Sequence, residues 1–451
     1  MNRTECLRRK DKDFIWHPFT QMADWEKDAP LIIERGEGNY LLDTEGRRYF
    51  DGVSSLWVNL FGHRRSEIEE AIRSQLELLA HSTFLGLSHV PAIELAEKLL
   101  ALSPPGLSRV FYSDNGSTAM EIALKMAFQY WQQKGGRGRK QEFMTHTQAY
   151  HGDTIGAVSA GGIDLFHKIF RPLLFSTRSL PTPHCYRCPY GLARPSCGLT
   201  CAARMEEEVR KHRETLAAVI VEPLVQGAAG MLMMPEGYLA RLRAVTRDCH
   251  VLLLCDEVAT GFGRTGTMFA CEQEGVSPDI MAVAKGLTGG YLPLAATLTT
   301  QEVYSAFLGR YEEFKAFFHG HSYTANPLGC AAALATLSIF AKEDVLKRVS
   351  LLSRRMAGEL AHLREHPHIG DIRQKGLMAG VEIVAHRETK EPFEASRKLG
   401  QRVVRKVREK GILLRPLGDI IVLMPPLSST EEEIQHLVRS LAWAIDAALA
   451  A

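Results

Sequence analysis

A lysine and an aspartate stand where two apolar runs end in the middle of the chain. Asp256 follows residues 251–255, and Lys285 follows the apolar run in "DIMAVAKGLTGG". Open α/β sheets form their ligand crevice at the carboxyl ends of strands. Burial at such a site lowers the pKa of an amine and makes it a nucleophile that can form a Schiff base with a carbonyl. Simpler alternatives stay open: a helix cap or ion pair for Asp256, and a strand-end amine that reaches solvent for Lys285.

A third candidate group lies in "SDNGSTAMEIALK", where a short apolar run gives way to a helical pattern. Free backbone N–H groups at a helix start suit a phosphate, and the hydroxyls of Ser117 and Thr118 add donors. An ordinary helix cap that binds nothing would have the same composition. Together, a phosphate cradle, a strand-end carboxylate and a Schiff-base lysine are the parts that hold pyridoxal phosphate. Tyr150 in "AYHGDT" offers an aromatic ring to cover the cofactor.

An arginine interrupts the apolar stretch "GILLRPLGDIIVLMPP". A charged side chain at Arg415 needs an anionic partner, and a carboxylate matches the guanidinium best because it accepts two parallel hydrogen bonds. The partner is either a bound acid or an Asp or Glu of the chain itself.

The elements that would position these residues alternate along the chain. Apolar runs of strand length recur in "RVFYS", "AAVIVEP", "VLLLCDE" and "DIMAVAKG", and helical patterns at 117–131 and 236–248 separate several of them. Such alternation is typical of buried parallel strands joined by helical crossovers. We therefore predict an α/β domain over about residues 66–335.

A smaller α+β unit is predicted from the two ends of the chain. A long helical pattern at about 330–364 precedes two strand-like stretches, and amphipathic helices follow around 393–410 and 430–450. These features assign residues 336–451 to a small domain. Residues 1–65 contain two short strands around an Asp-Thr-Glu-Gly turn at 40–50 and no evident core, so we expect them to pack with that domain.

The overall composition limits the kinds of partner. The chain has 451 residues, with 54 Lys and Arg against 52 Asp and Glu, for a net charge of +2. This balance gives no basic surface for nucleic acid or an anionic membrane, so small molecules are the expected partners. The beginning, "MNRTECLRRKDKDF", lacks the apolar core of a secretion signal, and no later segment is apolar enough to span a bilayer. We expect a cytoplasmic protein.

Four of the nine cysteines cluster as C-x2-C and C-x3-C in "HCYRCPYGLARPSCGLTC". Cys185, Cys188, Cys197 and Cys201 could close a tetrahedral zinc site, but their spacing matches no familiar finger. The alternative is a loop of free or redox-labile thiols. The cluster is distant in sequence from every candidate for chemistry, and no metal is assigned to the reaction. Four others lie in apolar surroundings and are expected in the core: Cys249, Cys255, Cys271 and Cys330.

The stretch "DEVATGFGRTGTMFACEQEGVSPDIMAVAKGLTGGYLPLAA" at 256–296 resembles the class III, fold-type I pyridoxal phosphate aminotransferases. The resemblance implies a large α/β domain with a mostly parallel sheet and a smaller α+β domain built from both termini. "WHPFTQM", "DGVSSLWVNLFGH", "YHGDTIGAVS", "HGHSYTANPLGCAAA" and "LRPLGDIIVLMPP" are similar to members that aminate 8-amino-7-oxononanoate in biotin biosynthesis. Coverage runs from about residue 14 to 440.

The resemblance implies a role for each matching residue. Lys285 forms the Schiff base with the cofactor and carries the proton, and Asp256 holds the pyridine nitrogen. The other residues expected at the cofactor are Gly116, Ser117, Tyr150, Val258, His321 and Ser322. Those expected at the substrates are Phe19, Trp57, Tyr150, Lys285, Gly320 and Arg415. Ser322 would reach the phosphate of a neighbouring subunit, which implies a homodimer with composite sites.

Several functional alternatives remain. The default amino donor is S-adenosylmethionine, but Phe19 stands where members that use this donor carry a tyrosine, so lysine is the other candidate. A broader ω-amino acid or diamine aminotransferase and an aminomutase would use the same fold. A zinc-binding interaction protein built around residues 184–201 would leave the cofactor residues unexplained.

Overall fold

The computed structural model describes residues 2–134 and 139–450. At its centre lies a seven-stranded sheet with the strand order β4-β12-β11-β10-β7-β5-β6. Six strands run in one direction, and β12 is antiparallel to both of its neighbours. The strands are β4 (Leu107–Ser113), β5 (Glu142–His146), β6 (Arg178–Leu180), β7 (Leu216–Val221), β10 (Leu252–Asp256), β11 (Ile280–Val283) and β12 (Ala295–Thr300). The predicted α/β class and mostly parallel sheet are confirmed.

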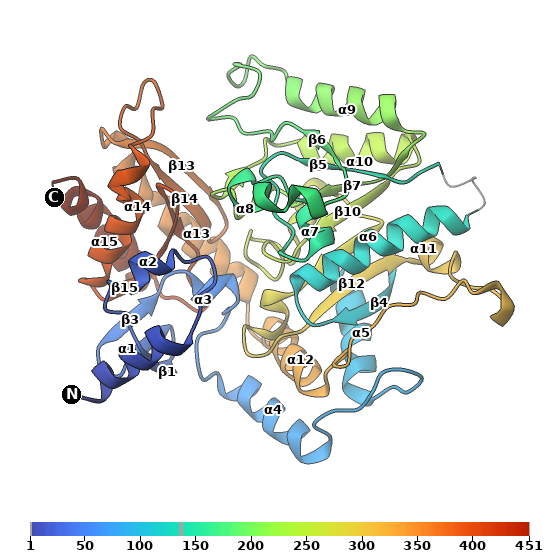
Figure 1. Ribbon diagram of the computed structural model, residues 1–451, viewed down its shortest axis with the longest axis horizontal. Coiled ribbons are helices and arrows are strands. Elements are labelled where there is room, and N and C mark those ends of the chain that lie inside the picture. The colour runs from blue at the N-terminus through green and yellow to red at the C-terminus, as the bar shows by residue number, and fades with distance from the viewer. Residues whose placement is uncertain (1, 135–138, 451) are drawn as a thin grey trace.

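Helices cover both faces of this sheet (Figure 1). On one face, α6 (Gly116–Gln133) packs across β7, β10, β11 and β12. On the other face, α10 (Tyr238–Asp248) contacts β10, and α9 (Thr200–His212) packs on α10. Successive residues of one strand alternate between the two layers: Leu252 and Leu254 join the α6 side, and Leu253 and Cys255 the other. This double coverage explains why the strands are continuous apolar runs rather than alternating patterns.

Other helices of the large domain lie at its edges. They are α4 (Ser66–Leu78), α5 (Val90–Leu102), α7 (Ile155–Ala160), α8 (Asp164–His167), α11 (Gln301–Ser305) and α12 (Pro327–Lys342), with a small hairpin of β8 (Val225–Gln226) and β9 (Leu232–Met233). Helix α12 packs against α4 and α5.

The N-terminal and C-terminal parts of the chain lie together on the left of Figure 1. The C-terminal part holds an antiparallel sheet, β13-β14-β17-β16, and three helices. Their bounds are β13 (Ile369–Lys375), β14 (Met378–Ile383), β16 (Arg415–Leu417), β17 (Ile420–Leu423), α13 (Val345–Ala361), α14 (Leu399–Arg408) and α15 (Glu431–Ala450). The boundaries at residues 65/66 and 335/336 stay predictions.

The N-terminal part joins the C-terminal part through a shared sheet. Strand β15 (Ile412–Leu413) pairs in parallel with β3 (Arg48–Asp51), with Ile412 opposite Phe50. The remaining elements are α1 (Arg3–Phe14), α2 (Met22–Trp25), β1 (Ile33–Glu37), β2 (Tyr40–Asp43) and the short turn α3 (Ser54–Trp57). The strands predicted around the turn at 40–50 are present as β2 and β3.

Two helix predictions need correction. The pattern at 330–364 is not one helix: α12 ends at Lys342, and α13 begins at Val345 after Glu343 turns to an extended conformation with φ −113° and ψ 141°. The helix predicted around 393–410 begins only at Leu399, because Lys398 takes a left-handed conformation with φ 46°. Both breaks are changes in backbone conformation at single residues, Glu343 and Lys398, so the hydrophobic pattern does not reveal them.

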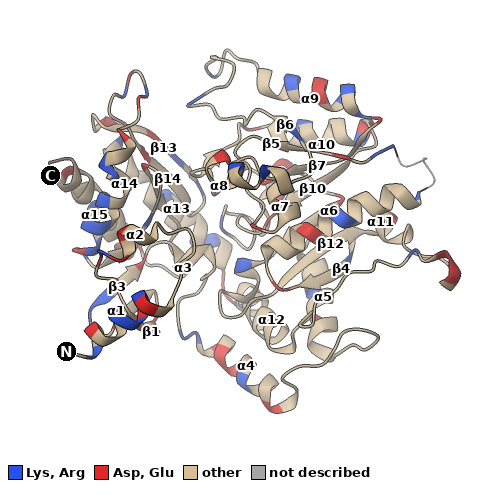
Figure 2. Cartoon of the chain, viewed as in Figure 1, with Lys and Arg blue, Asp and Glu red and all other residues tan. Residues whose placement is uncertain are grey.

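Charge is distributed without a dominant face. Figure 2 shows both signs interspersed over the helices and loops of this view. Among the described residues, no helix combines the length and apolar character that crossing a membrane requires.

Candidate active site

The carboxyl end of β10 places a buried aspartate in a cavity of about 440 Å³. Asp256 is 6% exposed, and its Oδ1 accepts a hydrogen bond from the Val258 backbone N–H at 3.1 Å. His151 Nδ1 donates to the other carboxylate oxygen, Oδ2, at 2.8 Å. Burial lowers the pKa of His151, but the hydrogen bond and charge of Asp256, with the charge of Glu222, raise it overall. The pair holds a negative group in place at the strand end.

Lys285 lies directly after β11, at the start of a 3₁₀ turn, and its side chain reaches the same cavity. Its backbone φ of 46° is left-handed, a conformation that costs a non-glycine residue about 1 to 2 kcal/mol and is often retained at functional sites. Burial lowers the pKa of the amine, Asp256 and Glu222 oppose this, and Arg264 lowers it further. The Nζ atom lies 5.0 Å from the centre of the Trp57 ring and has no hydrogen-bond partner within the described residues. An unpaired amine whose pKa is lowered by burial is better suited to act as a nucleophile.

The amino end of α6 forms another wall of the cavity. Asn115 caps this helix through its side chain, which accepts from the Thr118 N–H at 3.0 Å. Two glycines allow close approaches here. A Cβ on Gly116 would lie 2.6 Å from Val258 Cγ1, and one on Gly152, whose φ is +119°, would lie 2.1 Å from Ser117 Oγ. The helix start, Ser117 and the loop after Tyr150 therefore pack closely on one another and line the same cavity.

Glu222 ties two loops of the cavity together. Its Oε1 accepts from the Tyr150 backbone N–H at 3.1 Å, and its Oε2 accepts from the Gly227 N–H at 2.9 Å. Burial raises the pKa of Glu222 to about 7, because the positive field of His151 and the two backbone donors only partly offset the loss of water and the nearby charge of Asp256. Tyr150 itself donates its hydroxyl to Asp153 Oδ2 at 2.7 Å. Glu222 thus fixes the backbone from which the Tyr150 ring projects.

Residues from both ends of the chain close the cavity. Phe19, Trp57 and Arg415 all line it. Burial lowers the pKa of Arg415, and within the described residues this guanidinium has no carboxylate partner. Its Cζ lies 5.9 Å from the centre of the Phe19 ring. The alternative of an internal salt bridge for Arg415 is therefore absent from the described chain.

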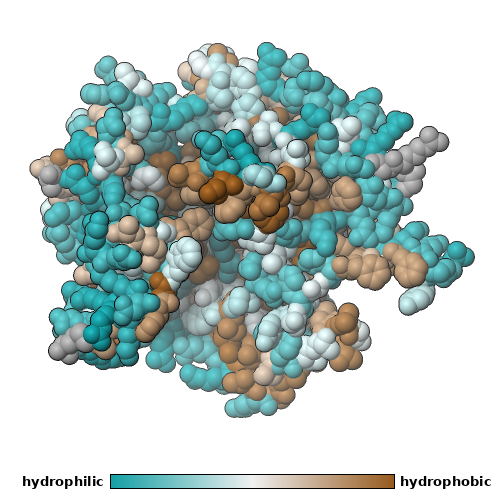
Figure 3. Space-filling model, viewed as in Figure 1, coloured by the Kyte–Doolittle hydropathy of each residue, from teal (hydrophilic) through white to brown (hydrophobic). Residues whose placement is uncertain are grey.

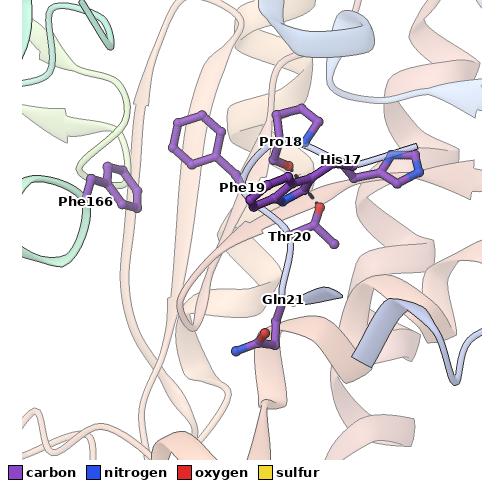
Figure 4. A pocket seen from close by; sticks show the side chains of 7 residues that line it. His17, Pro18, Phe19, Thr20, Gln21 and Phe166 are labelled. Carbon is purple, nitrogen blue, oxygen red and sulfur yellow. Dashed lines mark hydrogen bonds between the residues drawn. The ribbon is translucent and has the colours of Figure 1, made fainter. Parts of the chain in front are cut away.

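A second, more open cavity of about 580 Å³ adjoins the first. Figure 4 shows its lining, in which residues 16–21 of the N-terminal segment lie beside Phe166 of α8. The rings of Phe19 and Phe166 meet edge to face, with centroids 5.3 Å apart, and both residues line the two cavities. An aromatic pair therefore lies where the inner and outer cavities adjoin.

The structure brings most of the predicted site residues to the inner cavity. Those lining it are Phe19, Trp57, Gly116, Ser117, Tyr150, Asp256, Val258, Lys285 and Arg415. The segment with Gly320, His321 and Ser322 does not line it, and Gly320 and Ser322 are exposed. His321 lies beside the site, because its Nδ1 is 2.7 Å from Asp114 Oδ2 and Asp114 lines the cavity.

Sequence reasoning missed three buried residues near the site. His151 follows Tyr150 directly. Glu222 is the first residue after β7, and Asp256 is the last residue of β10, so the same strand-end signal could have found Glu222. Arg264 is 1% exposed and donates to the carbonyls of Pro425 at 2.7 Å and Asn59 at 2.8 Å. It joins the N-terminal and C-terminal parts behind Lys285.

The cysteine cluster lies apart from this site. Cys185, Cys188, Cys197 and Cys201 are free thiols that line a separate, small cavity. Within the described part of the chain, no group of three or more His, Cys, Asp or Glu residues stands ready to hold a metal ion. The other four predicted core cysteines are buried as expected.

Comparison with known proteins agrees with this arrangement. A model of the family "Aminotransferase class-III" matches residues 21–445. An adenosylmethionine-8-amino-7-oxononanoate aminotransferase of Nitratidesulfovibrio vulgaris is 55% identical over 98% of this chain and 82% of the relative. The protein of the same name from Geobacter sulfurreducens is 52% identical over 97% of both chains.

Solved structures show the same fold. The crystal structure of the adenosylmethionine-8-amino-7-oxononanoate aminotransferase from Methanocaldococcus jannaschii has a TM-score of 0.94 and 47% identity, covering 98% of this chain and 99% of that one. An (S)-enantioselective ω-transaminase from Thermomicrobium roseum has the same TM-score at 38% identity, covering 100% of this chain and 99% of that one. The family match spans most of the chain, and these relatives share its fold from end to end. The chain therefore belongs to the class-III aminotransferase family.

Proposed function

We propose that this chain uses pyridoxal phosphate to transfer an amino group from S-adenosylmethionine to 8-amino-7-oxononanoate, giving 7,8-diaminononanoate, in the cytoplasm. The names of relatives at 55% and 52% identity support both substrates. The observation that carries the proposal is Arg415, a guanidinium without a carboxylate partner in the described chain, in the same cavity as Lys285 and Asp256.

The residues present fit the cofactor. One cavity contains an unpaired amine at Lys285, a buried carboxylate at Asp256 and the start of α6 beside Ser117. These groups match, in turn, an aldehyde, a protonated pyridine nitrogen and a phosphate. When bound, pyridoxal phosphate supplies the carbonyl that receives the amino group and the ring that withdraws electrons from the reacting carbon.

The chain's own groups carry out binding and proton movement. The bonds from His151 and the Val258 N–H hold the Asp256 carboxylate in place, where it would stabilise a positive charge beside it. Lys285 Nζ, whose pKa is lowered by burial, would take the proton from the substrate carbon that bears the amino group and pass it to the cofactor, and in the acceptor half of the cycle it would carry a proton in the opposite direction. Tyr150 and Val258 supply the two apolar faces between which a flat ring fits.

Arg415 selects the keto acid. The acceptor ends in a carboxylate, and a partly buried guanidinium gains most from an anion that makes two parallel hydrogen bonds. Trp57, 6% exposed, provides an apolar wall for the alkyl chain and helps to exclude water. The outer cavity beside Phe19 and Phe166 gives room for the bulkier amino donor.

We also propose a homodimer with shared sites. Ser322 is exposed in this chain and Gly320 has nothing near its Cβ position, which leaves the segment free to meet a second copy. Figure 3 shows apolar side chains gathered around α4 at the lower edge of the molecule. Leu78 is 81% exposed and Leu85 is 91% exposed, and contiguous apolar surface of this kind is typical of an interface.

Steady-state turnover with a panel of substrates tests the proposal. Purified enzyme with 8-amino-7-oxononanoate should form 7,8-diaminononanoate with S-adenosylmethionine as the donor and not with lysine. Faster turnover with lysine would replace the donor, and faster turnover of putrescine or β-alanine would overturn the biotin-pathway assignment. Phe19→Tyr is the matched variant, since it restores only a hydroxyl at the edge of the donor cavity.

A further inference from the structure

The connection from β6 to α9, residues 181–199, forms neither helix nor strand. Connections of this length without secondary structure are uncommon inside a compact domain, and those that stay ordered need another source of order. This segment nevertheless makes specific contacts with the C-terminal part of the chain. Lys390 Nζ donates to the Tyr186 carbonyl at 2.6 Å, and Arg187 Nη2 donates to the Lys390 carbonyl at 2.8 Å.

Four cysteines, three from this segment and one from the start of α9, lie around the same small cavity. Cys185, Cys188, Cys197 and Cys201 all line a single cavity of about 20 Å³. A space of that size holds roughly one water molecule or ion and no organic ligand. These cysteines are distributed over 17 positions of the chain, from 185 to 201, yet all four line this one space.

The wall around the thiols is suited to a cation with anionic ligands. The cavity is also lined by proline and other apolar side chains, and Arg194 is a positive charge beside it. His184 lines it too, is 8% exposed, and its Nε2 has no hydrogen-bond partner in the described chain.

We propose that Cys185, Cys188, Cys197 and Cys201 bind one Zn²⁺ ion as a structural, four-thiolate site. Zinc in structural sites takes four Cys or His ligands in a tetrahedron, and a C-x2-C turn supplies two of them from one short loop. In the described chain these thiols line the cavity without yet forming a ligating group. Binding would require the four side chains to turn toward one ion; it would release the four thiol protons and leave a site with a charge of −2 beside Arg194.

The ion would stabilise a contact between domains that reaches the active site. Arg187, which lies between Cys185 and Cys188, pairs with Glu382 at 2.7 Å. Glu382 also pairs with Arg373 at 2.7 Å, and Arg373 Nε donates to the Gly230 carbonyl at 2.8 Å. Gly230 lies two residues after Ala228, which lines the catalytic cavity. A metal ion bound by residues 185–201 would therefore hold Arg187 in place for its ion pair with Glu382.

Metal analysis of the holoenzyme, purified without a histidine tag, tests the site. We expect about one zinc per chain, and its replacement by Co²⁺ should produce the strong near-ultraviolet absorption of thiolate-to-cobalt charge transfer. Cys188→Ser and Cys197→Ser should lose the zinc and the cobalt band. Cys6→Ser is the matched control, because Cys6 is a free, partly exposed thiol on α1, and it should keep both.

A thiol assay covers the case in which the Cys188 and Cys197 variants fail to fold. In the native wild-type enzyme, removing the metal with a chelator should expose four additional thiols to a thiol reagent and lower Tm by at least about 5 °C. Restoring Zn²⁺ should reverse both changes. Less than about half a zinc per chain together with nine free thiols after unfolding would overturn the proposal, and so would a disulfide within the cluster.

Discussion

The side of the cavity that we propose for the cofactor, with Asp256, His151 and Lys285, differs in construction from the side that we propose for the substrates, with Phe19, Trp57 and Arg415. On the cofactor side, Asp256 and His151 satisfy each other at 2.8 Å within one domain. On the substrate side, the Trp57 Nε1 and the Arg415 guanidinium lack such partners among the described residues. The difference teaches that the carboxylate at Asp256 is held in place by the chain itself, whereas the Lys285 amine, the Trp57 Nε1 and the Arg415 guanidinium are left without partners in the described residues.

Removing the amine of Lys285 should have the largest effect. Lys285→Ala should lower kcat at least about 10³-fold, because no other described amine lines the cavity to move the proton. The protein should still fold, since the left-handed φ of 46° costs alanine no more than lysine. Turnover assays and the thermal transition check both expectations. Activity within tenfold of the wild type would show that the cofactor side is not centred on Lys285.

Neutralising Asp256 should come next. Asp256→Asn keeps the shape but removes the negative charge next to His151, and should lower kcat about 10² to 10³-fold with little change in KM. Asp256→Glu is the matched control because it restores the charge at a displaced position and should recover part of the rate. Equal losses in the two variants would show that position rather than charge decides the effect.

The neighbouring carboxylate, Glu257, should affect stability rather than catalysis. It does not line the cavity, and burial raises its pKa to about 7, although Thr260 and the Cys271 and Ala270 backbone donors lower it in part. The folded state therefore binds a proton that the unfolded state releases above about pH 4.5, so Glu257 stabilises the fold below that pH and loses the contribution as pH rises to 7.

Glu257→Gln should remove this dependence. The shift from 4.5 to about 7 corresponds to at most about 3 kcal/mol in the free energy of unfolding. Denaturant unfolding of the variant and the wild type between pH 4 and 8 should show stability falling less steeply for the variant. Parallel pH profiles would refute a raised pKa for Glu257.

Weakening the substrate side should give the smallest effect, limited to one substrate. Arg415→Leu should lower kcat/KM for the keto acid about 10 to 100-fold, the equivalent of a lost charge-assisted hydrogen bond. The half-reaction with the amino donor should change little. Arg415→Lys, the matched control, keeps the charge without the two-pronged geometry and should lie between. A comparable loss for donor and acceptor would remove the distinction between the two sides.

The sequence could predict the site residues that have a local pattern, and not those that are defined by distant contacts. Asp256 lies at the end of one buried strand and Lys285 two residues after another. Their residue types and the local apolar pattern were therefore enough to predict that both lie at one edge of the sheet. Glu222 has the same signal at the end of β7 and was overlooked. His151 and Arg264 give no such signal, because their roles depend on hydrogen bonds to residues 105 and 161 positions away in the sequence.

Fold details escaped prediction for a related reason. The break between α12 and α13 depends on the backbone at Glu343, whose side chain pairs with Arg348 at 2.7 Å, and apolar periodicity does not register such contacts. The pairing of β15 with β3 joins segments more than 350 residues apart, which no local pattern specifies. The cysteine cluster was visible as a motif, but only the structure shows that its thiols share one cavity.

The central claim, that this cavity relays an amino group from S-adenosylmethionine to 8-amino-7-oxononanoate, is tested most directly by single-turnover absorbance of the holoenzyme. S-adenosylmethionine alone should convert the cofactor absorbance to that of the aminated form, and 8-amino-7-oxononanoate alone should then restore it. Lys285→Ala should show neither change. No response to S-adenosylmethionine, or no return with the keto acid, would contradict the account.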